Sequence, residues 1–388
     1  MTLDILCKVV DNFGDIGVVY RLARALSDAP DAPRIRLIVD DLAAFNLLEP
    51  AVDPSRAVQS IRGWTLLSWA GPDGSTNGAY EAAYNEDPAI AVIECFACGR
   101  PDWLEKMLFD AADGRTKTIV NLEYLTAEPY ADEFHRMPSL TRSRAVRKYI
   151  FMPGFTAATG GLILDGAFMA ALRRYAEPAT RTEFRRELTA RVGFDADGLE
   201  ANYWAVVFGY ERDYGRVVRD LAEFHRGRPV LAIVASGKSD ACFIAAWERA
   251  ERPFPVCRLP FLRQEAWDEV LCAADFLVVR GEDSMARAAL SGKPFLWHAY
   301  PQEGAHQMVK VRALLDRMRP HFGADEFSAV EDAFLAFNDR LADGVGVCGE
   351  ERILPLMRLE SGFRSFSAGL MANGNLGFNL MTFLREIV

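Results

Sequence analysis

The segment Arg280-Gly281-Glu282-Asp283-Ser284 contains the residue types that a phosphate site needs. It follows the apolar run 276–279 and precedes a helical pattern, which predicts a buried strand, a glycine turn and a helix start. Backbone N–H groups and the helix dipole would favour a diphosphate there, and Arg280 adds a fixed positive charge. Glu282 can accept hydrogen bonds from sugar or ribose hydroxyls. We therefore predict a nucleotide-diphosphate site, although the acid or serine of the first turn could also be only an N-cap.

Motifs that the sequence lacks argue against two classes of nucleotide site. The segment has no G-x-x-x-x-G-K, and Gly14-Asp15-Ile16-Gly17 does not match G-x-G-x-x-G, so NTPase and dinucleotide sites lose their usual support. A sugar nucleotide is the better prediction. Two aromatic loops, Phe208-Gly209-Tyr210 and Pro260-Phe261-Leu262-Arg263-Gln264, could frame its base, or could equally belong to the core.

A second acidic motif, Asp11-Asn12-Phe13-Gly14-Asp15, follows the first apolar run, residues 3–10. It puts two carboxylates four residues apart across a turn. Such a pair can hold a cation bidentately, or one member can orient or deprotonate a nucleophile. In a purely structural interpretation, Asp11 is a turn residue and Asp15 is the N-cap of the helix that follows.

The composition is that of a globular protein of the cytoplasm. Of 388 residues, half are apolar and a quarter charged, and the formal net charge of −10 argues against nucleic-acid and anionic-membrane partners. The first residues indicate a strand and not a signal peptide, and no apolar run approaches the roughly 20 residues that span a bilayer. Seven scattered cysteines indicate reduced thiols. Cys95-Phe96-Ala97-Cys98 has the spacing of a redox or zinc half-site, but no second pair or nearby histidine follows it.

Apolar strand runs alternate with helical patterns twice along the chain, which predicts two parallel sheets covered on both faces. A charged helix at 181–192 and a glycine-rich turn at 193–198 separate the two series. We expect an α/β protein of the GT-B glycosyltransferase architecture, with two Rossmann-like, doubly wound domains that face each other across a cleft. The predicted domains are 1–195 and 196–366, with a C-terminal helix at about 367–388 packing back on the first. Ligands bind beyond the carboxyl ends of the strands in such sheets, so both acidic motifs lie where substrates are expected.

Long motifs in both halves of the chain resemble the EarP family of bacterial protein-arginine rhamnosyltransferases. The resemblance runs from the first strand to Gln302; Tyr20 and Met285 depart from the expected Trp and Phe, and both changes are apolar. The matching segments are Lys8-Val9-Val10-Asp11-Asn12-Phe13-Gly14-Asp15-Ile16-Gly17, Arg21-Leu22-Ala23-Arg24, Asn121-Leu122-Glu123-Tyr124-Leu125, Arg280-Gly281-Glu282-Asp283-Ser284, Gly292-Lys293-Pro294-Phe295 and Trp297-His298-Ala299-Tyr300-Pro301-Gln302.

The resemblance implies an inverting GT-B enzyme that moves L-rhamnose from dTDP-β-L-rhamnose to an arginine of translation elongation factor P and so activates that factor. The first domain would bind the acceptor and the second the nucleotide sugar, with no metal or cofactor. Asp15 is then the catalytic carboxylate, Asp11 its neighbour and Glu282 a third essential acid. The implied donor-site residues are Phe208, Tyr210, Phe261, Gln264, Arg280, Asp283, Ser284 and Tyr300, of which the first four rest on shorter motifs.

The implied chemistry explains acids in place of a histidine base. An arginine side chain has a pKa above about 12 and a delocalised charge, so the enzyme must hold the planar cation, localise its charge and accept a proton. Carboxylates can do all three. His298 and His306 show no zinc spacing, so we expect no metal. Two other classes stay open: a small-molecule GT-B glycosyltransferase or sugar-nucleotide epimerase, and a non-catalytic binding protein on the same scaffold.

Overall fold

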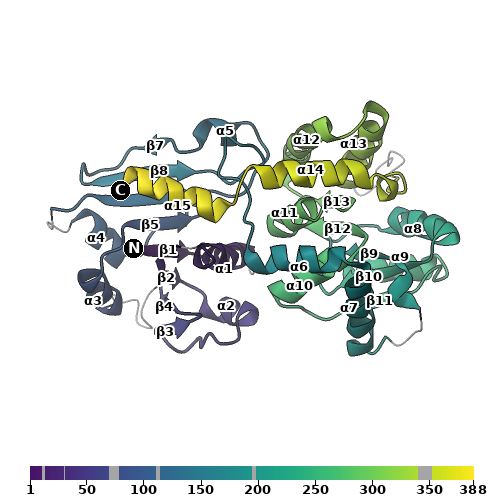
Figure 1. Ribbon diagram of the computed structural model, residues 1–388, viewed down its shortest axis with the longest axis horizontal. Coiled ribbons are helices and arrows are strands. Elements are labelled where there is room, and N and C mark those ends of the chain that lie inside the picture. The colour runs from purple at the N-terminus through teal and green to yellow at the C-terminus, as the bar shows by residue number, and fades with distance from the viewer. Residues whose placement is uncertain (11–13, 30, 70–77, 111–113, 195–197, 340–351) are drawn as a thin grey trace. The chain divides into compact units, whose positions relative to one another are not determined.

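The chain folds into two compact α/β units in the computed structural model (Figure 1). The structure describes residues 1–10, 14–29, 31–69, 78–110, 114–194, 198–339 and 352–388. Unit 1 comprises Met1–Gly166 and Ala372–Val388, and unit 2 comprises Ala167–Met371. The chain therefore leaves unit 1, builds unit 2 and returns to unit 1 at its C-terminal end.

Unit 1 is built on an eight-stranded sheet with the order β3-β4-β2-β1-β5-β6-β8-β7. Only β3 and β7, at the two edges, pair antiparallel to their neighbours. The six parallel strands follow the doubly wound order, which reverses between β1 and β5. The strands are β1 (Thr2–Cys7), β2 (Arg34–Val39), β3 (Val58–Ile61), β4 (Trp64–Ser68), β5 (Ala91–Cys95), β6 (Lys117–Leu122), β7 (Pro138–Ser139) and β8 (Val146–Phe151).

Helices cover both faces of this sheet because successive strand residues point to opposite sides. Ile5 of β1 belongs to a core cluster with α1 and α15, whereas Leu6 belongs to a second cluster with α4. Figure 1 shows α15, in yellow, lying over the sheet of unit 1, whose strands come from the N-terminal part of the chain. The helices are α1 (Gly14–Ser27), α2 (Leu42–Leu48), α3 (Gly78–Glu86), α4 (Asp102–Phe109), α5 (Tyr130–Phe134) and α15 (Leu376–Ile387).

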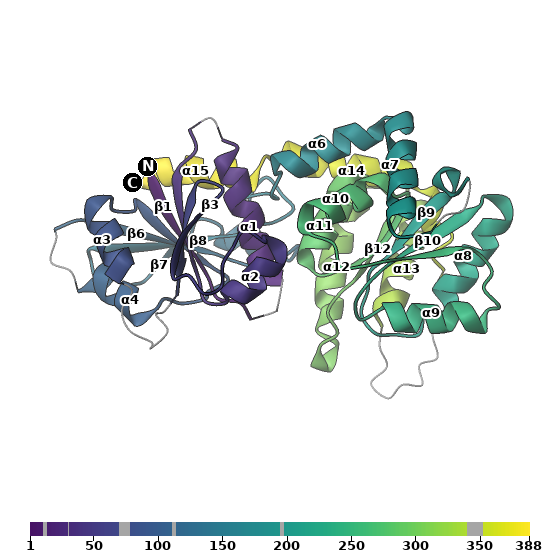
Figure 2. The ribbon, with the colours of Figure 1, turned by 90° about the horizontal axis from the view of Figure 1, so that it is seen from below.

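Unit 2 contains a five-stranded, fully parallel sheet with the order β11-β10-β9-β12-β13. The order reverses between β9 and β12. The strands are β9 (Tyr203–Val207), β10 (Val230–Ala235), β11 (Val256–Leu259), β12 (Phe276–Arg280) and β13 (Phe295–His298). The helices, labelled in Figure 2, are α6 (Gly166–Ala176), α7 (Pro178–Arg191), α8 (Gly215–Gly227), α9 (Asp240–Arg249), α10 (Gln264–Ala273), α11 (Glu282–Ser291), α12 (Gln307–Met318), α13 (Ala324–Asn338) and α14 (Glu360–Ala372), with short 3-10 turns at Leu199–Ala201, Glu303–Ala305, Arg319–His321 and Leu356–Arg358.

The boundary between the units differs from the one expected at residue 195. Helices α6 and α7 belong to unit 2, because Tyr175 donates a hydrogen bond to Glu269 of α10 at 3.0 Å and the buried Arg185 binds Asp275 at 2.6 Å. The sequence placed the charged helix at 181–192 next to the expected linker, because the partners that fix α6 and α7 in unit 2 lie about ninety residues further along the chain. At the other end, α14 stays in unit 2, where Ser367 donates to the Leu290 carbonyl at 2.7 Å.

Candidate active site

The predicted nucleotide loop lies at the point where the strand order of unit 2 reverses. β12 ends at Arg280, and β9, its neighbour in the sheet, ends just before Phe208. The Phe208 amide donates to the Val278 carbonyl at 2.8 Å, which holds the two strand ends together. In open parallel sheets this reversal point is where ligands bind. Gly281 forms the turn into α11 with φ of 69°, a left-handed value that a residue with a side chain rarely adopts.

Arg280 carries a positive charge that no described carboxylate neutralises. Its guanidinium carbon lies 4.6 Å from the centre of the Phe208 ring and 4.9 Å from that of Tyr210. The buried Nε finds no hydrogen-bond acceptor, and among the described residues no acid oxygen lies within 4.0 Å of the group. Two aromatic faces thus hold an uncompensated cation beside a helix N-terminus, an arrangement that suits an anionic ligand.

Hydrogen bonds join three more predicted residues across the starts of α10 and α11. The amide of Gln264 donates to Asp283 at 3.4 Å, and the Trp267 indole donates to the Ser284 hydroxyl at 3.2 Å. Trp267 also packs edge-on against Phe208, with ring centres 5.1 Å apart. Trp267 is not among the residues predicted from the sequence, although its position one helical turn after Gln264 was a usable signal.

Two predicted aromatic residues expose their rings to solvent. Tyr300 is 57% exposed and contacts Tyr210 edge-on, with ring centres 5.3 Å apart, while Phe261 is 53% exposed in the loop that leads into α10. Tyr210 itself is buried and held by His298, whose Nδ1 accepts from the Tyr210 amide at 3.1 Å. Exposed rings beside a polar site are available for stacking on a planar ligand.

A further cation, Lys238, was missed by the sequence analysis. It lies in the loop after β10, and its Nζ is 6.0 Å from the centre of the Tyr210 ring. The neighbouring Ser239 ties this loop to the β9 end, since its hydroxyl accepts from the Gly209 amide at 2.9 Å. Within the described ranges Lys238 has no ion pair. The adjacency depends on β10 lying next to β9, which spacing alone did not reveal.

Glu282, the predicted third acid, lies in the first turn of α11 and is only partly buried. Its carboxylate is 3.7 Å from the Lys310 ammonium group of α12, a loose and partly exposed ion pair. Such pairs contribute little to stability. The Glu282 carboxylate therefore lies next to the predicted nucleotide loop and is not fixed by a strong structural contact with Lys310.

In unit 1 the structure gives Asp15 defined partners. Asp15 is 3% exposed in the first turn of α1, where Oδ2 accepts from the Val10 amide at 2.9 Å and Oδ1 accepts from the Tyr124 hydroxyl at 3.0 Å. The predicted neighbour Asp11 lies outside the described residues. A helix N-terminus stabilises a carboxylate, so this position suits a negatively charged group.

Buried charges fix the helix that carries Asp15. Arg21 lies two turns along α1 and binds Asp165 at 2.6 Å, with both side chains fully buried. Arg24 lies 3.7 Å from the other oxygen of the same carboxylate and stacks on Tyr20 at 4.6 Å. Removing one partner of such a pair leaves an unpaired buried charge. The arginines of the Arg21-Leu22-Ala23-Arg24 motif therefore fix α1, and with it Asp15, in position.

The Cys95 and Cys98 pair shows no sign of redox reactivity. Both are free thiols. Burial raises the pKa of Cys98 to about 11 and raises that of Cys95 well above its ordinary value, so both stay protonated near neutral pH. In the described part of the chain, no three His, Cys, Asp or Glu side chains converge as a metal site would require, and no helix there is long and apolar enough to cross a bilayer.

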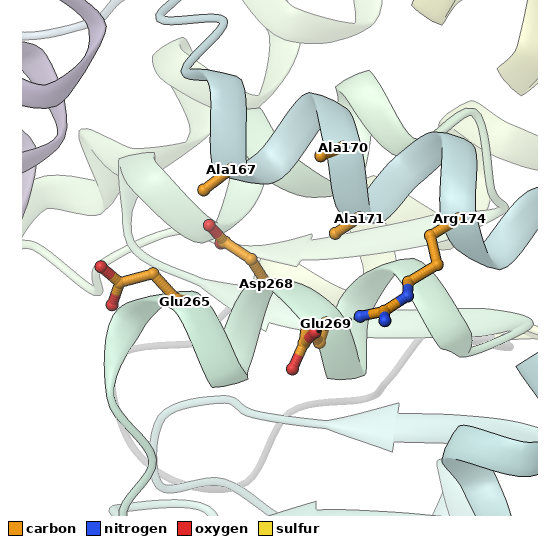
Figure 3. Close-up of a pocket in the computed structure, with 7 residues that line it drawn as sticks. All are labelled: Ala167, Ala170, Ala171, Arg174, Glu265, Asp268 and Glu269. Atoms are coloured by element: carbon orange, nitrogen blue, oxygen red, sulfur yellow. Dashed lines mark ion pairs between the residues drawn. The ribbon is translucent and has the colours of Figure 1, made fainter. Parts of the chain in front are cut away.

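A cavity of about 380 Å³ lies between α6 and α10 of unit 2 and contains none of the predicted site residues. Figure 3 shows alanines of α6 facing the acids of α10, with Arg174 extending toward Glu269, and the Arg174 guanidinium lies 3.7 Å from that carboxylate. The cavity is lined by Ala167, Ala170, Ala171, Arg174, Glu265, Asp268 and Glu269.

The two doubly wound units, with polar groups gathered at the carboxyl ends of their strands, define a GT-B glycosyltransferase fold. A family model described as "Elongation-Factor P (EF-P) rhamnosyltransferase EarP" matches residues 3–385. The protein-arginine rhamnosyltransferases of Pseudomonas aeruginosa and Shewanella oneidensis are 35% and 32% identical to this chain, over 92% and 85% of both sequences. The chain belongs to the EarP family, as its motifs predicted.

A solved structure agrees with this assignment. It describes EarP-mediated arginine glycosylation of translation elongation factor EF-P, and it matches 100% of this chain and 99% of its own with a TM-score of 0.60 at 24% identity. The GT-B fold expected from the sequence is therefore confirmed.

Proposed function

We propose that this chain is an inverting, metal-independent protein-arginine rhamnosyltransferase that moves L-rhamnose from dTDP-β-L-rhamnose to an arginine of elongation factor P. The observation that carries the proposal is Arg280, a cation without a described counterion at the strand-reversal point of unit 2. Family membership supports the sugar and the amino acid. The donor nucleotide, the stereochemistry and the freedom from metal are inferences from the chemistry of the residues.

The donor would bind through its diphosphate. Arg280 and the first turn of α11, at Asp283 and Ser284, would hold the two phosphates, with Lys238 as a second cation. The exposed rings of Phe261 and Tyr300 would pack on the base. As the bond from C1 of the sugar to the diphosphate oxygen breaks, the leaving group gains negative charge. Fixed cations and oriented N–H groups stabilise that charge without a metal ion.

The acceptor nitrogen would attack C1 from the side opposite the diphosphate, which inverts the β-configuration. A new C–N bond forms, the C1–O bond breaks and dTDP leaves. The attacking nitrogen must then lose a proton, which Asp15 can accept. Asp11 would help to grip the cation, and Glu282 would hold sugar hydroxyls or stabilise the positive charge that develops on the sugar ring.

Incubation of the chain with dTDP-β-L-rhamnose and elongation factor P, followed by intact mass analysis, tests the proposal. We expect one added deoxyhexose per acceptor, located on an arginine, at a rate that EDTA leaves unchanged. NMR of the product should show the inverted α-linkage. An unmodified acceptor in the presence of enzyme that binds dTDP would refute the proposal and favour a small-molecule acceptor. An EDTA-sensitive rate or a retained β-linkage would overturn those parts alone.

A further inference from the structure

Two aromatic rings beside Asp15 form a feature that the predicted site did not include. Tyr124, two residues after β6, stacks on Phe96, directly after β5, with ring centres 4.3 Å apart and an angle of 14° between the rings. Tyr124 is 48% exposed as a residue, and its hydroxyl donates to Oδ1 of Asp15 at 3.0 Å. A half-exposed aromatic side chain is thus held against a buried carboxylate.

The position of these rings is that of a ligand site. Asp15 follows β1 and Phe96 follows β5, and these are the adjacent strands between which the strand order of unit 1 reverses. Tyr124 follows β6, the next strand along. All three side chains therefore come from the segments that follow strands at the carboxyl edge of the sheet, where doubly wound proteins bind ligands: Asp15 from the first turn of α1, and Phe96 and Tyr124 from loops.

The backbone at Phe96 is strained, and the strained turn places the Phe96 ring against Tyr124. Phe96 and Ala97 both adopt left-handed conformations, with φ of 61° and 50°. Residues with a side chain disfavour this region, and glycine would form the same turn without cost. The turn is held by the Leu122 carbonyl, which accepts from Phe96 N at 2.7 Å, and by the Asn121 side chain, which accepts from Ala97 N at 3.1 Å. Strain of this kind gathers at functional sites.

We propose that the Phe96–Tyr124 stack is the platform that receives the guanidinium group of the acceptor and selects arginine over lysine. The inference rests on the proposed function. A guanidinium has a flat face and N–H groups at its edge; the face can lie on the Tyr124 ring while the edge donates to Asp15. A lysine ammonium group has no flat face and would use the carboxylate only. The hydrogen bond from the Tyr124 hydroxyl to Asp15 fixes the ring and the carboxylate relative to each other, so that one guanidinium group can contact both.

Replacing Tyr124 by Leu and by Phe separates the two contributions. We expect Tyr124→Leu to raise the acceptor KM about tenfold or more, since a desolvated cation–ring contact corresponds to roughly that factor. Tyr124→Phe keeps the ring, so its acceptor KM should stay near wild type while kcat falls, because Asp15 loses an orienting bond. The Kd for dTDP should not change in either variant. Phe378→Leu replaces another exposed aromatic residue of unit 1, which lies on α15 and is 58% exposed, and serves as the matched control.

A double-mutant cycle with the acceptor gives the decisive result. Two forms of unmodified elongation factor P are compared, one with its acceptor arginine and one with that arginine replaced by alanine. The affinity of each form is measured for the wild-type enzyme and for Tyr124→Leu. We expect the arginine to contribute to affinity in the wild type and to contribute much less in the variant. Additive losses, or an unchanged acceptor KM in Tyr124→Leu, would overturn the platform while transfer itself continues. If the wild type modifies no arginine at all, the proposed function fails instead, and the two failures are distinguishable.

Discussion

Replacing Arg280 by methionine should weaken donor binding strongly and leave the fold intact. Arg280 packs on Phe208 and Tyr210 but has no described acid partner, and its buried Nε has no acceptor. An unsatisfied buried donor costs about 1–3 kcal/mol. The lost cation–ring contacts are worth about 0.5–2 kcal/mol each. The two effects oppose each other, so the free energy of unfolding should change by less than about 1 kcal/mol and Tm by less than about 4 °C.

The effect on the ligand is much larger. Charge-assisted hydrogen bonds to a diphosphate contribute about 1.5–3 kcal/mol, so the Kd for dTDP should rise by a factor of about 10–150. Isothermal titration calorimetry with dTDP gives the Kd, and thermal unfolding of the same samples gives Tm. The wild-type affinity should fall as salt is added, and the affinity of Arg280→Met should depend on salt less steeply.

Arg185→Met is the matched control for a buried arginine with a structural role. Arg185 donates to the carbonyls of Ala273, Glu200 and Asn202 and pairs with Asp275 at 2.6 Å. Its loss should destabilise the fold by about 3–5 kcal/mol with little effect on the dTDP affinity of the folded protein. If Arg280→Met instead lowers Tm as much as the control does and binds dTDP normally, Arg280 is a structural residue and the donor site has been misplaced.

Three further changes test separate parts of the structure. Asp15→Asn should lower kcat at least about 100-fold in steady-state kinetics with the Kd for dTDP unchanged, because it removes the proton acceptor; normal turnover would exclude that role. Burial and the nearby Arg136 lower the pKa of His135 to about 4, below its unfolded value. As pH falls from about 6.5 to 4, His135 therefore takes up a proton in the unfolded chain before it does so in the folded chain. Denaturant unfolding should show that the free energy of unfolding falls by about 1–2 kcal/mol over that window. His135→Gln should abolish this loss. Arg21→Met should cost up to about 3–5 kcal/mol in the same assay, since it removes the 2.6 Å partner of the fully buried Asp165 and leaves Arg24 at 3.7 Å; a loss below about 1 kcal/mol would show that Arg24 compensates the carboxylate.

The strand-to-helix settings of Arg280 and of Asp15 could be predicted from the sequence, because each residue lies between a largely apolar strand and a helical pattern. For Arg280 and Ser284, the strand, the glycine and the helix start that define this setting are adjacent in the chain. The aromatic loops stayed ambiguous, because a phenylalanine at a strand end packs equally well in a core. The structure shows Phe208 and Tyr210 around the Arg280 guanidinium, contacts over about 70 residues of sequence.

Other features could not be predicted because they depend on the order of strands in the sheet. Lys238 approaches Tyr210 because β10 lies next to β9, and Tyr124 meets Phe96 because β6 lies next to β5. Local patterns do not specify such neighbours. The unit boundary differs from residue 195 for the same reason: the charged helix at 181–192 was expected to separate the two series, but its Arg185 donates to carbonyls at the end of α10 and beside β9.

The return of the chain to unit 1 has a consequence for its synthesis. Leu376, Leu380 and Leu384 of α15 are buried in the same core as β1 and α1. On the ribosome, the strands of the first 166 residues therefore emerge long before the helix that covers them, while all of unit 2 is still to be made. Domains that form early during translation normally complete their core at once. Here the core of unit 1 can be completed only after α15, the last helix, has been synthesised. Chains interrupted before residue 372 should therefore expose the apolar face of unit 1 that α15 covers to chaperones and proteases, even when unit 2 is complete.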